Sequence, residues 1–132
     1  MKLVIGGCFQ GKLDYVLNEY KLTESYISEN ELPSEALLKK VENQKKRMVL
    51  NHFHIWMRNR MLQGGNPEQE IMDFVKQHSD MIVISDEIGN GIVPVDAFER
   101  EYRERTGRIL VRLAEEADEV VRVVCGIGQK IK

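Results

Sequence analysis

The fold is decided by Met81-Ile82-Val83-Ile84-Ser85-Asp86-Glu87-Ile88-Gly89-Asn90-Gly91-Ile92-Val93-Pro94. The first four residues form an apolar run, and two carboxylates, two glycines and a proline come after it. Such a run is typical of a buried strand, and the glycines and proline are typical of a loop. In α/β sheets, ligands bind at the carboxyl ends of the strands. The stretch therefore predicts a buried strand that carries a ligand-binding loop.

A second strand-and-loop pattern opens the chain, where Leu3-Val4-Ile5 is followed by Gly6-Gly7-Cys8-Phe9-Gln10-Gly11-Lys12. Gly6, Gly11 and Lys12 fit the phosphate-binding pattern G-x-x-x-x-G-K, in which backbone N–H groups surround a phosphate and the lysine adds a charge. The pattern continues with Ser or Thr, whose hydroxyl helps to hold magnesium. Leu13 stands there instead. Phosphate binding is predicted and metal-assisted transfer is weakened; a glycine turn that binds nothing is the alternative.

The loop of residues 86–94 offers two kinds of ligand contact. Asp86 and Glu87 are suited to binding magnesium or a sugar hydroxyl, and Gly89 and Gly91 allow a close approach of the backbone. A tight turn whose carboxylates cap the next helix is the alternative interpretation.

The helix after this loop carries two arginines on one face. Arg100, Arg103 and Gly107 share that face because their spacings are three and seven residues. Arginines there could clamp a phosphate. Glutamates alternate with them, so ordinary surface ion pairs fit equally well.

The periodicity predicts strands at 2–5, 26–27, 48–50, 81–84 and 119–124, and helices at 11–20, 34–46, 52–62, from 67 onward with Asn66 as N-cap, and 96–116. This alternation is typical of an α/β layered fold with a mainly parallel sheet. The second helix contains a basic run, for which a solvated helix face is favoured over a phosphate patch. The run consists of Lys39, Lys40, Lys45, Lys46 and Arg47.

Length and composition predict one cytoplasmic domain over residues 1–132. Hydrophobic residues make up 42% and charged residues 30%, and the net charge of −2 argues against nucleic-acid binding. No apolar run approaches the roughly 20 residues of a membrane span, and none resembles a secretory signal. Cys8 and Cys125 give no disulfide framework, and Cys8 has no evident catalytic partner. His52 and His54 lack a third ligand, so no metal site is predicted, and helix-start or core histidines are favoured.

Several segments, most of them near the carboxyl end, carry a resemblance to one family. They are Asp86 to Pro94, Arg100 with Arg103, Gly107, Ala117-Asp118-Glu119-Val120 and Gly126 to Lys132. This carboxyl-terminal part resembles the bifunctional adenosylcobinamide kinase / adenosylcobinamide-phosphate guanylyltransferase family of cobalamin biosynthesis. Gly6 to Lys12 is similar to the family's phosphate loop, Tyr26-Ile27 matches its second strand, and His54-Ile55-Trp56 with Asn59 resembles its central segment.

The resemblance implies an α/β P-loop NTPase-like (RecA-like) three-layer fold, GTP or ATP as the nucleotide, cobinamide as a further substrate, and a homotrimer. It also implies catalytic roles for Lys12 and Glu87. The nucleotide-binding residues that it implies are Gly6, Gly7, Gly11, Lys12, Asp86, Glu87, Gly89, Gly91, Pro94, Arg100 and Arg103.

The departures from the family pattern concern catalysis. Gln10 and Leu13 replace two serines of the phosphate loop, and Asn51 replaces a carboxylate expected near magnesium. Leu110-Val111 stands in place of an Asn-Gln pair. The segment from Glu29 to Arg47 is shortened and has no histidine, although a histidine there takes up GMP in the family.

The sequence therefore predicts a cobalamin-biosynthesis-type nucleotide-binding protein and leaves its activity and its use of Mg²⁺ open. An inactive nucleotide-sensing or partner-binding paralogue is the alternative. A subunit that completes a hetero-oligomer with an intact homologue is the third.

Overall fold

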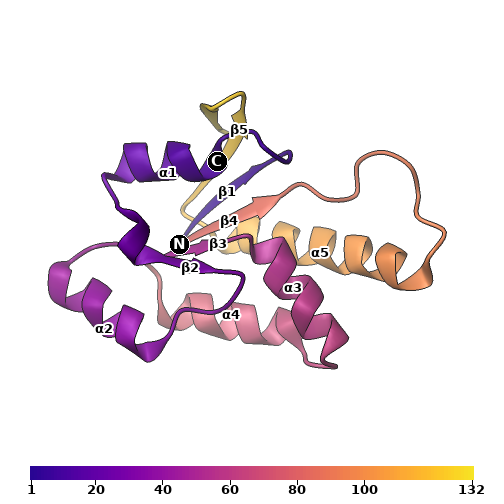
Figure 1. Cartoon of the computed structure of the whole chain (residues 1–132), viewed down its shortest axis with the longest axis horizontal. Helices are drawn as coiled ribbons and strands as arrows, with labels where there is room; N and C mark the ends of the chain where they lie inside the picture. Colours follow the sequence, from indigo (N-terminus) through magenta and orange to yellow (C-terminus); the bar gives the residue numbers. More distant parts are fainter.

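The computed structural model describes all residues from 1 to 132 and contains one six-stranded sheet in the order β2-β3-β4-β1-β5-β6 (Figure 1). The strands are β1 (Lys2–Gly6), β2 (Ile27–Glu29), β3 (Val49–Asn51), β4 (Ile82–Asp86), β5 (Glu119–Val124) and β6 (Ile127–Lys130). All neighbouring strands are parallel except β5 and β6, which are antiparallel. The first strand of the chain therefore lies in the interior of the sheet, between β4 and β5.

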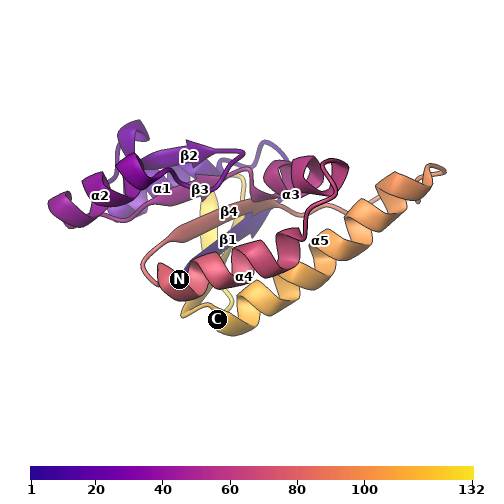
Figure 2. The ribbon, with the colours of Figure 1, turned by 90° about the horizontal axis from the view of Figure 1, so that it is seen from below.

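Helices cover both faces of the sheet, as the predicted three-layer fold requires. They are α1 (Lys12–Tyr20), α2 (Glu35–Gln44), α3 (Phe53–Leu62), α4 (Pro67–Gln77) and α5 (Ala97–Glu116), with a short 3₁₀ turn, η1 (Glu24–Tyr26), before β2. Figure 2 shows α4 and α5 along one side of the sheet, and α1 lies on the other. None of these helices combines the length and the apolar character that crossing a membrane would need.

The core is centred on β1 and β4, whose apolar side chains are almost completely buried. Val4 pairs with Ile84 and Leu3 with Val83, and each of these four is at most 1% exposed. Strands covered on both faces are expected to be rich in β-branched and aliphatic residues. The predictions of these two strands from apolar runs are confirmed.

The helix starts are explained by ordinary capping chemistry. Asn66 Oδ1 accepts a hydrogen bond from the first turn of α4, and Pro67 is the first helical residue, as predicted. Asp96 Oδ1 caps α5 in the same way. The alternative interpretation, in which Asp86 or Glu87 caps this helix, is wrong.

The basic run does not lie on one helix. α2 ends at Gln44, because Lys45 adopts a left-handed conformation with φ of 52°. Only Lys39 and Lys40 therefore belong to a helix face, and residues 45–47 lie beyond it. The expectation of a single solvated helix face is wrong for the last three residues of the run.

The strand β6 has no counterpart among the predicted strands. It pairs with β5 through the two-residue turn Cys125-Gly126, whose φ angles are 51° and 76°. Two successive positive φ values are typical of the type I′ turn that joins antiparallel strands. The strand has the polar sequence Ile-Gly-Gln-Lys at the edge of the sheet, so it has no apolar periodicity to detect.

Candidate functional site

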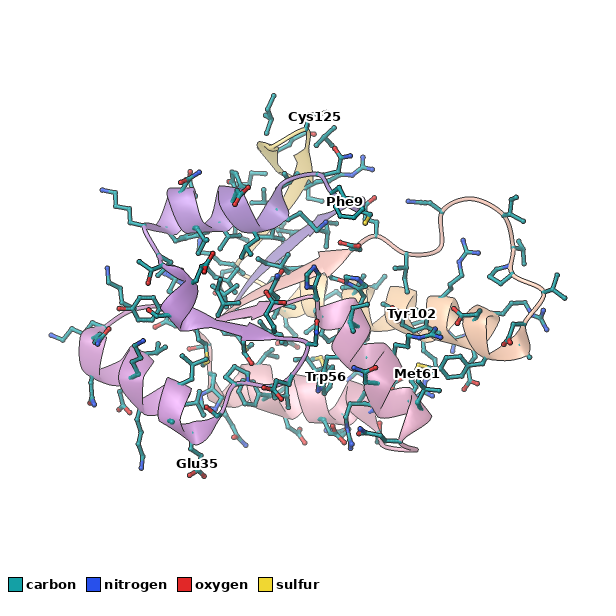
Figure 3. All side chains as sticks on the ribbon, viewed as in Figure 1. Phe9, Glu35, Trp56, Met61, Tyr102 and Cys125 are labelled. Carbon is teal, nitrogen blue, oxygen red and sulfur yellow. The ribbon has the colours of Figure 1, made fainter.

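A pocket of about 290 Å³ lies at the carboxyl ends of β1, β3 and β4. Because parallel strands end at the same edge of a sheet, the segments after them meet there. The lining residues are Cys8, Phe9, Gln10, Gly11, Lys12, Leu13, Asp14, Asn51, His52 and Asp86. Figure 3 shows Phe9 at this end of the molecule, and its side chain is 99% exposed.

The glycines of the first loop have separate structural reasons. A Cβ atom on Gly6 would lie 2.5 Å from the carbonyl oxygen of Val123, so no side chain fits between β1 and β5. Gly11 has φ of 82° and stands at the N-cap of α1. It offers no side chain to cap the helix, so N–H groups of the first turn remain available to an anion.

The loop is also fixed from outside by the β5–β6 turn. The Cys125 N–H donates to Gln10 Oε1 (2.7 Å), and the Gly126 N–H donates to the carbonyl oxygen of Gln10 (2.8 Å). Gln10, which replaces a serine of the family pattern, therefore joins two segments 115 residues apart in the chain.

Lys12 occupies the floor of the pocket with 7% of its side chain exposed. Its ammonium donates to the carbonyl oxygen of Gly7 (2.6 Å) and lies 2.7 Å from Asp86 Oδ1. The predicted residues Gly6, Gly7, Gly11, Lys12 and Asp86 are thus brought together. A buried cation beside unpaired backbone N–H groups is a suitable place for a phosphate.

His54 supports Asp86 from behind. Its Nδ1 accepts a hydrogen bond from the Asp86 N–H (3.1 Å), and its Nε2 lies 3.4 Å from Asp86 Oδ2. Burial lowers the pKa of His54, and the nearby Asp86 opposes this in part. The Tyr102 hydroxyl donates to the His54 carbonyl (2.7 Å), and burial raises the pKa of Tyr102 to about 12. His54 is thus a core histidine, as the sequence favoured.

A second polar cluster stands at the ends of β2 and β3. Glu29 and Asn51 pair in the sheet register, and Asn51 Nδ2 donates to Glu29 Oε1 (2.7 Å). His52 Nδ1 lies 2.9 Å from Glu29 Oε2. None of these three is among the site residues predicted from the sequence. A signal was present, because Asn51 and His52 come directly after a predicted strand and such residues converge at this edge.

The remaining predicted site residues lie outside the pocket. Glu87 forms a two-point ion pair with Arg122 (2.7 and 3.0 Å). Arg100 donates to the carbonyl oxygens of Pro94 and Val95, and Arg103 donates to those of Asn90 and Ile92. Gly89 and Gly91 have φ of 101° and 90°, which shapes the loop. None of the residues from Glu87 to Arg103 lines the pocket.

Magnesium ligands are scarce in this arrangement. Leu13 has no hydroxyl, Asn51 is a neutral amide where a carboxylate would be needed and is oriented by its Nδ2 bond to Glu29, and Asp86 is paired with Lys12. The residues present therefore do not fit a protein-held magnesium site of the kind that P-loop enzymes use.

Comparison with known proteins adds the family. The family model described as cobinamide kinase / cobinamide phosphate guanyltransferase matches residues 18–131, so it begins within α1, after the glycine loop. The bifunctional adenosylcobalamin biosynthesis protein CobU of Salmonella typhimurium is 48% identical over 52 residues. CobU of Escherichia coli is 44% identical over 52 residues. Each alignment spans 39% of this chain and 29% of the relative. Because the family model covers most of the chain, this protein belongs to the cobinamide kinase / cobinamide phosphate guanyltransferase family.

Proposed function

We propose that the pocket binds the phosphates of GTP or ATP and that the protein acts on cobinamide in cobalamin biosynthesis. The observation that carries this proposal is the placement of Lys12, whose ammonium is held inside the glycine loop by the Gly7 carbonyl and Asp86. Family membership supports the choice of nucleotide and of cobinamide.

The phosphates would replace Asp86 as the partner of Lys12. Backbone N–H groups of the glycine loop and of the first turn of α1 would complete the cradle, and the positive end of the helix dipole favours an anion there. Asp86 would then turn to His54, whose Nε2 is already 3.4 Å away. We restrict the proposed phosphate site to Gly6, Gly7, Gly11, Lys12 and Asp86, because these residues are gathered around one cation.

Calorimetry with GTP and ATP, each with and without Mg²⁺, tests the proposal. Lys12→Ala should weaken binding at least tenfold, because charge-assisted hydrogen bonds contribute about 1.5–3 kcal/mol. Lys46→Ala is the matched control, since it removes the same charge near the opposite edge of the sheet and should bind like the parent. Magnesium should change affinity little because the protein supplies few ligands. Equal affinity of Lys12→Ala and the parent would contradict the assigned site.

A second candidate function is non-catalytic nucleotide sensing or partner binding. It is favoured by three coincident departures: Leu13 in the phosphate loop, Asn51 after β3, and the absence of histidine from Glu29 to Arg47. It predicts nucleotide binding without turnover. Phosphorylated or guanylylated cobinamide, detected by mass spectrometry after incubation with the purified protein, would exclude it.

The oligomeric state distinguishes two further versions of the proposed function. The resemblance implies a homotrimer, whereas a supporting subunit would form a hetero-oligomer with an intact homologue. Light scattering of this chain alone, and of a mixture with such a homologue, distinguishes them. A new species in the mixture supports the hetero-oligomer, and a trimer of the single chain supports the homo-oligomer.

A further inference from the structure

His52 differs from every other group on the pocket wall in having a free basic nitrogen. Its side chain is 48% exposed, it lines the same pocket as Lys12 and Gly11, and its Nδ1 is held 2.9 Å from Glu29 Oε2. Nε2 makes no hydrogen bond within the protein.

The hydrogen bond to Glu29 fixes the proton on the ring. An ionised carboxylate only accepts hydrogen bonds, so Nδ1 of neutral His52 is the protonated nitrogen. The lone pair is then on Nε2, the nitrogen without a protein partner. A carboxylate that orients an imidazole in this way also stabilises the imidazolium formed when Nε2 takes up a proton.

Glu29 is itself held in place. Asn51 Nδ2 donates to Oε1 (2.7 Å) while His52 occupies Oε2, so both carboxylate oxygens are engaged. A carboxylate at position 51 could not donate this bond and would repel Glu29. The amide at position 51, a departure from the family pattern, is therefore the residue that allows Glu29 to sit beside His52.

The backbone at His52 is left-handed, a conformation that few non-glycine residues adopt and that His tolerates better than most. Its φ of 54° and ψ of 47° place it in the left-handed region, between β3 and α3. Non-glycine residues in this region are uncommon, and they concentrate at sites where the surrounding structure fixes a functional group. His54 is no alternative base, because it is buried and its Nδ1 already accepts a bond from the Asp86 N–H.

We propose that His52 is a general base for phosphoryl transfer from the bound nucleotide to an alcohol, with Glu29 as its positioning residue. This inference rests on the proposed function. Nε2 takes the proton of the acceptor hydroxyl while the hydroxyl oxygen forms a bond to the γ-phosphorus. The bond from that phosphorus to the β–γ bridging oxygen breaks, its electron pair stays on the nucleoside diphosphate, and the imidazolium later releases its proton to water.

The test compares nucleotide affinity with turnover in the full chain, with GTP or ATP supplied as the magnesium complex and cobinamide as the alcohol. His52→Asn is the main variant, because Asn tolerates left-handed backbone better than most residues. Its turnover should fall about 100-fold or more while its nucleotide Kd stays within twofold, since general acid–base catalysis typically contributes 10²–10⁴-fold. Glu29→Gln should show a smaller fall in turnover, with unchanged Kd. His78→Gln is the control and should match the parent, because His78 follows α4 before the start of β4 and does not line the pocket.

A second variant separates base chemistry from packing. In His52→Gly, the left-handed backbone remains relaxed and the ring is removed, so imidazole added to the buffer should restore part of the lost turnover. Three outcomes would each overturn the inference and leave the proposed nucleotide binding standing. They are unchanged turnover in His52→Asn, no rescue of His52→Gly by imidazole, and a parent protein that binds nucleotide but forms no product. A parent that binds no nucleotide would overturn both.

Discussion

The two glycine-containing loops at the carboxyl edge of the sheet differ in what holds them. The loop of residues 7–11 is docked against the β5–β6 turn through Gln10 and surrounds the pocket. The loop of residues 87–96 extends away from the sheet (Figure 1). Its backbone carbonyl oxygens accept hydrogen bonds from the side chains of Arg100 and Arg103. Ile92 and Val95 in this second loop are more than 90% exposed.

This difference shows that the end of a strand positions only the residues directly attached to it. Asp86, the last residue of β4, lines the pocket, whereas none of the residues from Gly89 to Pro94 does. Hydrogen bonding along β4 fixes the position of Asp86. Beyond the strand, the direction of the chain depends on the side chains that contact the loop, and here those are Arg100 and Arg103 of α5.

The largest expected effect is on stability, when one glycine at each loop is replaced by alanine in turn. Gly6→Ala should lower the free energy of unfolding by about 3 kcal/mol, because the new Cβ would meet the Val123 carbonyl at 2.5 Å. The Cβ of Gly91→Ala would meet no atom within 4 Å. Only the φ of 90° disfavours alanine there, so we expect a loss of about 1 kcal/mol in the free energy of unfolding. Urea unfolding measures both. Similar losses in the two variants would erase the proposed distinction.

A smaller effect is expected where the first loop meets the β5–β6 turn. Gln10→Ala removes the acceptor of the Cys125 N–H, and the loss of one such bond corresponds to about 1 kcal/mol. Gln129→Ala is the control, because this side chain is exposed on β6 and makes no hydrogen bond. Hydrogen exchange should quicken at the Cys125 amide in the first variant only. Unaltered exchange at that amide would show that Gln10 does not anchor the loop.

The pH dependence of stability should depend on His54, which contacts Asp86 of the pocket. Burial lowers the pKa of His54 below its ordinary value of 6.5, so the unfolded chain binds this proton more readily than the folded one. The stabilisation by neutral His54 is present above pH 6.5 and is lost as the pH falls towards the lowered pKa. The unfolding free energy of the parent, measured in urea from pH 8 to about pH 5, should therefore decline more steeply than that of His54→Gln. Parallel curves would contradict a buried neutral imidazole.

The smallest global effect is expected in the second loop. Arg103→Ala removes the bonds to Ile92 and Asn90, so backbone amides of residues 87–96 should exchange faster while the unfolding free energy changes by less than about 0.5 kcal/mol. Nucleotide affinity should stay that of the parent. A marked loss of affinity would instead place Arg103 on the phosphate, as the family resemblance implies.

Those parts of the fold that have apolar patterns could be predicted from the sequence. β1 and β4 are buried on both faces, so their runs of Val, Ile and Leu are easily detected. β6 escapes detection because an exposed edge strand needs no apolar face. The end of α2 is misplaced because Lys45 leaves the helix through a left-handed backbone, for which a lysine gives no signal.

The candidate site could be predicted only where a local sequence pattern marks its residues. The G-x-x-x-x-G-K spacing and the acidic residue that ends β4 identify Lys12 and Asp86, which form an ion pair in the structure. The cluster of Glu29, Asn51 and His52 depends on the pairing of β2 with β3, and a strand of three residues carries too little pattern to set that register. No local motif marks a contact that two separate strands create.

The interior position of β1 has a consequence for the order in which the molecule can form. Residues 2–6 are synthesised before their partners in the sheet, which are residues 82–86 and 119–122. Contacts so distant along the chain slow folding, and the amino-terminal half has no complete sheet of its own to join. The glycine loop therefore acquires its shape only when β4 and β5 have both been added. A segment that leaves the ribosome well before its partners is therefore among the last parts of this sheet to become fixed.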